Sequence, residues 1–250
     1  MIRTKLLPPS PRFEEVPRPE LLARLQAGSV RKLTLIEAPV GYGKTTLLNQ
    51  WLRTEEPDLG PNQPFAWVSL DKQDNDPTRL WKHIVEALRG VAPEERFGAD
   101  ALAGLGMVGT SLVETALPAL VNDLTELPHR AVLVLDDYHY VTDGECHETV
   151  GFLIRHLPET VHLVISTRSD PPLGRLRARG EVNELRGEQL AFSEEETASL
   201  LWERLGLTIE CADIGAGKVV SGWFYWDQLS LLSQLGITEQ PGLFLSAEGF

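Results

Sequence analysis

Lys44 and Thr45 close a glycine-containing stretch whose residue types suit the binding of a polyphosphate. The stretch reads Ala38-Pro39-Val40-Gly41-Tyr42-Gly43-Lys44-Thr45-Thr46. Enclosing phosphates requires main-chain N–H groups that point inward, glycines that allow the necessary dihedral angles, and a lysine that reaches the β- and γ-phosphates. A hydroxyl must follow the lysine to coordinate Mg²⁺. We therefore predict that residues 39–46 bind a nucleotide and that Thr45 is a metal ligand.

The residues on both sides of this loop have the patterns of a buried strand and an amphipathic helix. Leu33, Leu35 and Ile36 form an apolar run typical of a strand buried on both faces of a parallel sheet. After the loop, apolar residues recur as one helical stripe, at Leu47, Leu48, Trp51 and Leu52. Ala38 departs from the usual pattern, which has a glycine at this position. A chance glycine-rich turn is the alternative interpretation, and the flanking strand and helix disfavour it.

Two adjacent carboxylates, Asp136 and Asp137, follow another apolar run at 131–135. In a nucleotide site one such carboxylate holds Mg²⁺ through water, and the next orients or deprotonates the attacking water. We assign Asp136 to the metal and Asp137 to the water. Paired acids at a strand end can instead form a solvated turn, but the phosphate loop upstream favours the catalytic interpretation.

Arg168 ends the next predicted strand, at 162–167. The carboxyl ends of parallel strands meet at one edge, so Arg168 is expected beside the loop and the acid pair. Its guanidinium would there stabilise charge that develops on the γ-phosphate. The spacing is nearly as compatible with a surface ion pair between Arg168 and Asp170 or Glu181. His139 lies near the acid pair in sequence and either orients it or packs in the core or on the surface.

Predicted strands and helices alternate along most of the chain. The strands are expected at 33–36, 65–70, 131–135, 162–167 and 182–185. The helices are expected at 19–28, from Lys44, from Pro77, at 111–127 with a kink or division at Pro118, and at 148–157. Residues 1–18 are expected to be extended and residues 90–110 to form a surface loop. The alternation favours an α/β fold with a doubly wound parallel sheet flanked by helices.

Length, charge and cysteine content narrow the class of protein. A chain of 250 residues can bury one sizeable core and a smaller appended unit. The net charge of −13 argues against non-specific binding of nucleic acid. Cys146 and Cys211 form no C-x-x-C motif, and the N-terminus has no apolar run long enough for a signal peptide or a spanning helix. A cytoplasmic location and no membrane contact are expected.

The residue pattern of the sequence changes after residue 192. Ser193 and Glu196 have the spacing of a capping box that opens a helix to about Leu205. Beyond this helix, Gly, Trp and Leu are mixed without a clear strand pattern. We therefore expect a nucleotide-binding domain at 1–192 and an all-helical unit at 193–250.

With both motifs placed, the chain resembles the ATP-dependent LuxR-type transcription activators related to the maltose-regulon activator. These activators belong to the signal-transduction ATPases with numerous domains (STAND). The matching motifs run through most of the chain and include Thr4-Lys5-Leu6, Val16-Pro17-Arg18-Pro19, the phosphate loop, Asp74-Asn75-Asp76-Pro77, Leu135-Asp136-Asp137-Tyr138-His139, Ser166-Thr167-Arg168, Gln189-Leu190-Ala191-Phe192-Ser193 and Gly222-Trp223.

The resemblance implies a P-loop NTPase fold of the AAA/STAND type, followed by a helical lid that is incomplete here. In this family ADP holds the protein closed and monomeric, while ATP and an inducer open it to self-associate and activate transcription. Slow hydrolysis would reset the switch. By the same resemblance, Gly41, Gly43, Lys44 and Thr45 match the phosphate loop, Asp136 and Asp137 the acid pair, Arg168 the phosphate-sensing arginine, and Arg18 a nucleotide-proximal N-terminal segment.

The end of the chain departs from the family pattern. Family members continue into a winged-helix unit, an inducer-binding repeat domain and a C-terminal helix-turn-helix, and residues 206–250 match the lid poorly. Direct DNA binding by this chain is therefore not expected. We expect an ATP/ADP-binding switch module with weak Mg²⁺-dependent ATPase activity. The alternatives are an interaction module that binds nucleotide without turnover, and a degenerate fragment that does not hold its lid closed.

Overall fold

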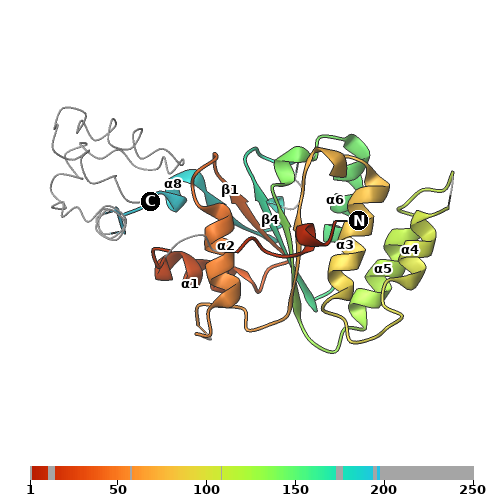
Figure 1. The fold of residues 1–250 in the computed structure, drawn as a ribbon, viewed down its shortest axis with the longest axis horizontal. Helices are drawn as coiled ribbons and strands as arrows, with labels where there is room; N and C mark the ends of the chain where they lie inside the picture. The colour runs from red at the N-terminus through yellow and green to blue at the C-terminus, as the bar shows by residue number, and fades with distance from the viewer. Residues whose placement is uncertain are drawn as a thin grey trace, which may run out of the picture.

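A five-stranded parallel β-sheet forms the centre of the molecule in this computed structural model (Figure 1). The structure describes residues 2–10, 15–56, 58–107, 109–172, 177–193 and 196–197. The strands are β1 (Leu33–Glu37), β2 (Phe65–Ser69), β3 (Ala131–Asp136), β4 (Val161–Thr167) and β5 (Val182–Arg186). They lie in the order β2-β3-β4-β1-β5, and every neighbouring pair is parallel. The predicted α/β fold with a parallel sheet is confirmed.

The register of the strands brings their carboxyl ends to one edge of the sheet. Ser69 lies opposite Asp136, and Glu37 lies opposite Thr167. Every residue of β3 and β4 is buried, because helices cover both faces of these central strands. Each chemistry-bearing residue that ends a strand is therefore delivered to the same side of the molecule.

Helices pack on both faces of the sheet (Figure 1). Two of them, α1 (Pro19–Gly28) and α2 (Lys44–Arg53), cover one face. The other face is covered by α3 (Pro77–Arg89), α5 (Ala116–Thr125) and α6 (Gly144–His156), and α4 (Ala99–Leu105) packs on α3 and α5. The short elements are the 3-10 helices η1 (Arg3–Leu6), η2 (Lys72–Asp74) and η3 (Tyr138–Tyr140), and the single-turn helix α8 (Gly187–Leu190).

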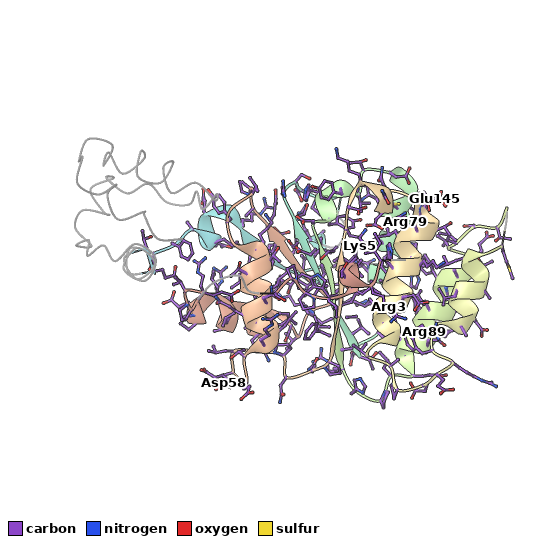
Figure 2. All side chains as sticks on the ribbon, viewed as in Figure 1. Arg3, Lys5, Asp58, Arg79, Arg89 and Glu145 are labelled. Atoms are coloured by element: carbon purple, nitrogen blue, oxygen red, sulfur yellow. The ribbon has the colours of Figure 1, made fainter. Side chains whose placement is uncertain are left out.

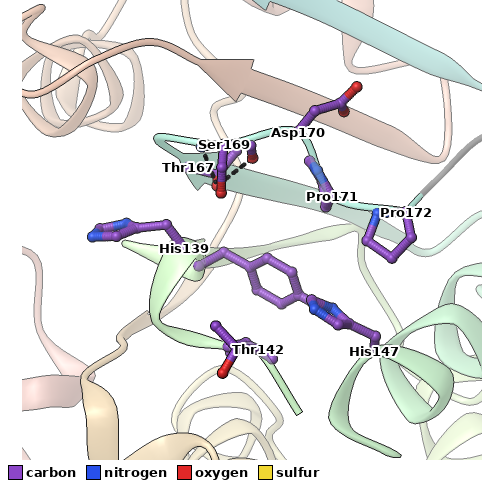
Figure 3. Close-up of a pocket in the computed structure, with 10 residues that line it drawn as sticks. His139, Thr142, His147, Thr167, Ser169, Asp170, Pro171 and Pro172 are labelled. Carbon is purple, nitrogen blue, oxygen red and sulfur yellow. Dashed lines mark hydrogen bonds between the residues drawn. The ribbon is translucent and has the colours of Figure 1, made fainter. Parts of the chain in front are cut away.

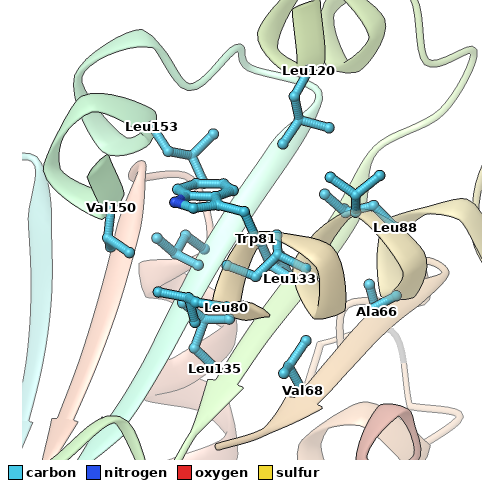
Figure 4. Close-up of a cluster of buried hydrophobic side chains, with 14 of the residues drawn as sticks. Ala66, Val68, Leu80, Trp81, Leu88, Leu120, Leu133, Leu135, Val150 and Leu153 are labelled. Carbon is cyan, nitrogen blue, oxygen red and sulfur yellow. The ribbon is translucent and has the colours of Figure 1, made fainter. Parts of the chain in front are cut away.

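Large apolar side chains fill both layers. On the α3 side, Trp81 is fully buried and packs in a cluster with Leu133 of the sheet and Leu153 of α6 (Figure 4). On the α2 side, the fully buried Trp51 lies with its ring centroid 6.2 Å from that of His162, in an edge-to-face arrangement. As the sequence indicates, α3 begins at a proline behind a capping aspartate, because the Asp76 carboxylate accepts a hydrogen bond from the N–H of Arg79.

The prediction of a surface loop at 90–110 is wrong, because this segment contains α4 with Ala101 and Leu105 buried. The small residues that suggested a loop allow α4 to approach α5 closely. A Cβ atom placed on Gly104 would lie 3.0 Å from Cα of Ala116. Here glycine and alanine serve helix–helix packing rather than chain flexibility.

Two helix boundaries and the N-terminal segment also differ from the prediction. Helix α5 begins only at Ala116 and continues to Thr125, so Pro118 lies in its first turn, where a missing N–H breaks no helical bond and the helix is not divided. Helix α6 begins at Gly144 because the Asp143 carboxylate caps it through the N–H of Cys146. The N-terminal segment, expected to be extended, contains η1.

The N-terminal segment is attached to the rest of the molecule by a buried ion-pair cluster. The Lys5 ammonium pairs with the carboxylates of Asp71 and Asp74. Asp74 is fully buried and also accepts from His83 Nδ1 at 2.8 Å, with Arg79 Nε at 3.5 Å. Lys5 and Arg79 are labelled in Figure 2, at the side of the molecule where η1 meets α3. The cluster fixes η1 against the segment that follows β2.

The expected helical unit at 193–250 lies outside the described residues, except for Ser193, Glu196 and Thr197. At Ser193 the predicted capping box is present: the Ser193 N–H donates to the Glu196 carboxylate, and the Glu196 N–H donates to the Ser193 hydroxyl. The Gly222-Trp223 pair also falls outside the described part of the chain.

Candidate functional site

The predicted phosphate loop joins the end of β1 to the first residue of α2, as expected. Gly41 and Gly43 have positive φ angles of 88° and 72°. A Cβ atom on Gly43 would meet nothing within 4 Å, so the left-handed backbone, and not lack of space, is what requires glycine there. Gly43 is also the N-cap of α2, and its side-chain-free position leaves the first N–H groups of the helix uncapped by any side chain.

The Lys44 ammonium lies over the beginning of the same loop. It donates to the carbonyl oxygens of Ala38 at 2.7 Å and Pro39 at 2.9 Å. Its pKa is lowered, first by burial and then by the positive charge of Arg168, while Asp137 and Asp136 act in the opposite direction. The charges of Arg168, Asp136 and Asp137 therefore all act on the Lys44 ammonium.

Thr45 brings the loop into direct contact with the end of β3. Its hydroxyl donates to Oδ2 of Asp136 at 2.9 Å. Asp136 is only 2% exposed, and its Oδ1 accepts no hydrogen bond from the described residues. Burial is the main reason that the pKa of Asp136 is raised, and the neighbouring charge of Asp137 adds to the effect, while the hydroxyls of Ser166 and Thr45 act in the opposite direction.

Asp137 occupies a different environment from its neighbour. Its backbone is left-handed, with φ 59° and ψ 36°, a conformation that aspartate tolerates better than most residues. Its carboxylate is partly exposed and lies 3.8 Å from a guanidinium nitrogen of Arg168 and 3.6 Å from Nδ1 of His139. The two adjacent acids are thus divided between a buried position at Thr45 and an accessible position among basic groups.

Arg168 is placed beside the acid pair and makes its ion pair with Asp137, while Asp170 pairs with Arg177. The alternative ion pairs of Arg168 with Asp170 or Glu181 are not among the contacts of the described residues. Both ring nitrogens of His139 are buried without a hydrogen-bond partner in the described part of the chain. Burial, followed by the charge of Arg168, lowers the pKa of His139, which favours the neutral ring.

A pocket of about 250 Å³ opens next to these residues and was not foreseen from the sequence (Figure 3). It is lined by η3, the start of α6 and the segment that follows β4, including Tyr138, His139, His147, Ser169 and Asp170. The Tyr138 hydroxyl and His147 Nδ1 both line it and lie 3.0 Å apart, within hydrogen-bond distance. The signal for this pocket in the sequence was the run of polar residues after two neighbouring strands.

The hydrogen-bond partners of Arg18 are residues outside the loop. Its guanidinium donates to the carbonyl oxygens of Leu190 and Ala191 and to the carboxylate of Glu196. The role of Arg18 in nucleotide binding stays a prediction. The remaining loop residues are placed as follows: Pro39 and Thr46 are exposed, and Val40 and Tyr42 are half-buried.

Clustered metal ligands and membrane-spanning helices are both absent from the described residues. Within these ranges no three His, Cys, Asp or Glu side chains are grouped so that they could hold a metal by themselves. In the same part of the chain, no helix combines the length and the apolar character needed to cross a lipid bilayer.

Comparison with known proteins agrees with this geometry. Residues 27–167 match the family model described as AAA domain. The HTH-type transcriptional regulator MalT of Vibrio campbellii is 33% identical over 226 residues, which cover 89% of this chain and 24% of the regulator. MalT of Yersinia enterocolitica is 34% identical over 236 residues, covering 93% and 25%. The chain thus spans about a quarter of the length of the curated relatives it matches, and the predicted resemblance is confirmed.

One solved structure shows the same fold. It is a signal-transduction ATPase with numerous domains, with a tetratricopeptide repeat sensor, from Pyrococcus horikoshii. Its TM-score is 0.57 at 19% identity, and the match covers 84% of this chain and 29% of that chain.

Proposed function

The chain belongs to the AAA domain family, and on that premise we propose that it is an ATP/ADP-binding switch module with weak Mg²⁺-dependent ATP hydrolysis. The observation that carries the proposal is the hydrogen bond between Thr45 and Asp136. It joins the loop that would enclose the phosphates to the carboxylate that would share their metal ion. Five residues have proposed roles at the reacting phosphate and lie at one edge of the sheet: Lys44, Thr45, Asp136, Asp137 and Arg168.

The chemistry of this pair suits a magnesium ion. Mg²⁺ prefers oxygen ligands and keeps several waters, and a threonine hydroxyl with one carboxylate supplies such a partial set. In the part of the chain that the structure describes, the buried Oδ1 of Asp136 has no hydrogen-bond partner. This supports the assignment, because a buried charged oxygen is stabilised only when it is paired or hydrogen-bonded. When bound, the ion would neutralise negative charge on the phosphate oxygens.

The remaining residues take roles that follow from their exposure and charge. Lys44 would place its ammonium on the β- and γ-phosphates, exchanging the two loop carbonyls that it now binds. Asp137 is the accessible carboxylate and would accept a hydrogen bond or a proton from the attacking water. Arg168, 3.8 Å from Asp137, would stabilise charge on the γ-phosphate. The neutral His139 beside Asp137 would orient that carboxylate.

The relatives named above are transcriptional regulators, and this chain corresponds to about a quarter of their length. We extend the proposal to a regulatory role: the module would act in the cytoplasm, with ADP favouring a closed monomer and ATP favouring self-association. We assign no direct DNA contact to this module. The size of the population shift would equal the difference in the affinities of the two states for each nucleotide.

Calorimetric titration with ADP and ATP, with and without Mg²⁺, tests the proposal. Lys44→Ala is expected to abolish binding, and Lys82→Ala, at an exposed lysine of α3, is the matched control. Unchanged ATP affinity in the Lys44 variant would reject the assignment. Asp137→Ala is expected to bind normally and to slow turnover, since its carboxylate is not part of the buried metal pair.

The second candidate is binding without turnover. Single-turnover release of phosphate from bound ATP in the presence of Mg²⁺ distinguishes the two functions. Release that depends on Asp137 supports the ATPase, while stable bound ATP supports an interaction module that uses nucleotide only as a ligand.

A further inference from the structure

A single arginine connects the N-terminal segment to the segment that follows the last strand. The Arg18 guanidinium is almost fully buried. It donates to Leu190 O at 2.7 Å and Ala191 O at 2.8 Å, and both Nε and a terminal nitrogen donate to the Glu196 carboxylate at 3.0 Å. The guanidinium also lies 4.6 Å from the ring centroid of Phe192. Charge-assisted, two-pronged contacts of this kind are among the strongest hydrogen bonds in proteins.

Glu196 has two functions in this cluster. Its carboxylate accepts from Arg18, and it also closes the capping box with the N–H of Ser193 at 2.9 Å. Loss of its charge would therefore weaken both the attachment to Arg18 and the local structure at residue 193. We call this set of contacts, formed by Arg18, Leu190, Ala191 and Glu196, the Arg18 clasp.

The clasp is connected to the phosphate loop through α8. The helix α8 ends at Leu190, whose carbonyl is held by Arg18, and begins at Gly187, which lies against the loop. A Cβ atom on Gly187 would be 3.5 Å from Pro39 Cδ and 3.7 Å from Tyr42 Cε1, which are ordinary packing distances. A displacement of α8 would therefore remove the wall behind these two loop residues.

A second connection runs through α2, the helix that carries Lys44 and Thr45. The Gln50 side-chain amide of α2 donates to the carbonyl of Val16 at 2.9 Å, two residues before Arg18. The segment around Arg18 thus bridges the phosphate-loop helix and the clasp. The loop thus packs against α8 at Pro39 and Tyr42 and leads directly into α2. Both helices are hydrogen-bonded to the segment around Arg18.

We propose that Arg18 is a positioning residue of the phosphate loop: its clasp holds α8 against Pro39 and Tyr42 and so fixes the loop in its binding conformation. The inference rests on the proposed function in that the loop is taken to bind nucleotide. It assigns to Arg18 a role through protein contacts, in contrast to direct contact with the nucleotide. Because coupling is reciprocal, nucleotide on the loop stabilises the clasp to the same degree.

Hydrogen–deuterium exchange of the full chain, first without nucleotide, is the primary test. Arg18→Lys keeps the charge but loses the fork that binds several acceptors at once. It is expected to accelerate exchange at 187–192 and at 37–43, with α3 unchanged. Glu196→Gln, which removes the charge and leaves an amide of the same shape, is expected to act in the same direction. The matched control is Arg24→Ala, at an exposed arginine of α1, and should not differ from the unmodified chain.

Calorimetry and exchange with ADP complete the test. In the unmodified chain ADP should protect 187–192, and this protection should be lost in Arg18→Lys, with ADP affinity lower by roughly tenfold, about 1.4 kcal/mol. Uniform acceleration throughout the chain would overturn the proposal in favour of a general structural role. Weaker ADP binding with unchanged exchange at 37–43 would overturn it in favour of direct contact.

The two proposals fail separately. If the unmodified chain binds no ADP, the proposed function is rejected, while the exchange at 37–43 without nucleotide still decides whether the clasp positions the loop. If ADP binds and the clasp variants bind it equally well, the positioning role is rejected and the nucleotide site stands.

Discussion

The hydroxyl of Thr45 and the carboxylate of Asp136 are 91 residues apart in sequence and 2.9 Å apart in space. Thr45 is the second residue of α2 and Asp136 is the last of β3, and β1 and β4 connect these two elements through the sheet. The position of one oxygen atom relative to the other is therefore set by the rigid centre of the fold. Sites built on such elements are held more precisely than sites built on loops alone.

Asp136→Asn should stabilise the protein and disable its metal-dependent binding. The buried carboxylate has a raised pKa because burial disfavours its charge, so its ionised form at pH 7 opposes folding. The neutral amide should therefore increase the free energy of unfolding at pH 7. Urea denaturation measures the gain, and Mg²⁺-dependent ATP titration measures the loss. A destabilised variant would show that Asp136 is paired more effectively than its contacts indicate.

Gly43→Ala should destabilise the loop although there is room for the added methyl group. The strain comes from φ of 72°, which is expected to cost about 1 to 2 kcal/mol for a residue with a Cβ atom. Thermal unfolding measures this cost. Gly144→Ala is the control, because Gly144 also meets nothing within 4 Å and is not among the glycines with positive φ. Equal effects of the two substitutions would contradict the backbone argument.

Lys5→Met should destabilise the protein by roughly 3 kcal/mol, because it leaves the fully buried Asp74 carboxylate with fewer positive partners. Lys72→Ala, at an exposed lysine of η2, is the control and should change the unfolding free energy by less than about 0.5 kcal/mol. Chemical denaturation compares both with the unmodified chain. If Lys5→Met behaves like the control, the N-terminal segment is not anchored by this cluster.

Folding stability should fall on acidification through protonation of His162. Burial lowers the pKa of His162 to about 4, and the ring is held by Arg31 O and the Thr34 hydroxyl. The unfolded state takes up the proton near pH 6.5, whereas the folded state takes it up only near pH 4. The contribution of His162 to the free energy of unfolding is therefore fully present above about pH 6.5 and is lost as the pH falls towards 4. The full loss over this range is about 3 kcal/mol. His83, His139 and His147, whose pKa values are also lowered, contribute with the same sign.

Urea denaturation at pH 7.5 and at pH 4.5 provides the measurement. A His162→Asn variant, which is less stable at both values, should show a smaller difference between them. An equal pH dependence in the two proteins would exclude His162 as a major cause.

Cys146 should resist thiol reagents in the native protein. Its thiol is fully buried, and burial with nearby carboxylates raises its pKa to about 12. In a Cys211→Ser background, 5,5′-dithiobis-(2-nitrobenzoic acid) at pH 8 should label Cys146 only after urea is added. Rapid labelling without urea would show that α6 opens locally, since the thiol lies on that helix.

The parts of the fold with regular patterns were predictable from the sequence. The apolar run before Asp136 identified β3, and Pro77 with the capping Asp76 identified the start of α3. The region of α4 was misread, because its many small residues allow both loops and close helix packing, and only the neighbouring Ala116 decides between them. Tertiary contacts of this kind leave little periodic signal in a single chain.

The residues of the candidate site also differ in how far the sequence predicts their placement. Gly43, Lys44 and Thr45 follow from local chemistry, and the grouping with Asp136 follows from the common edge of a parallel sheet. The contacts of Arg18 with Glu196 and with the carbonyls of residues 190 and 191 could not be predicted, because they join distant segments through backbone oxygens that no residue type encodes.

The fully buried indole of Trp51, on the helix that carries Lys44 and Thr45 and edge-on to His162, gives the protein a built-in optical reporter. A protonated imidazole beside an indole quenches its emission, so the intensity from Trp51 should follow the charge of His162. Rearrangement of the loop should shift the wavelength of the same signal. The chain has six tryptophans, so the contribution of Trp51 is the difference between the emission of the unmodified chain and that of a Trp51→Phe variant.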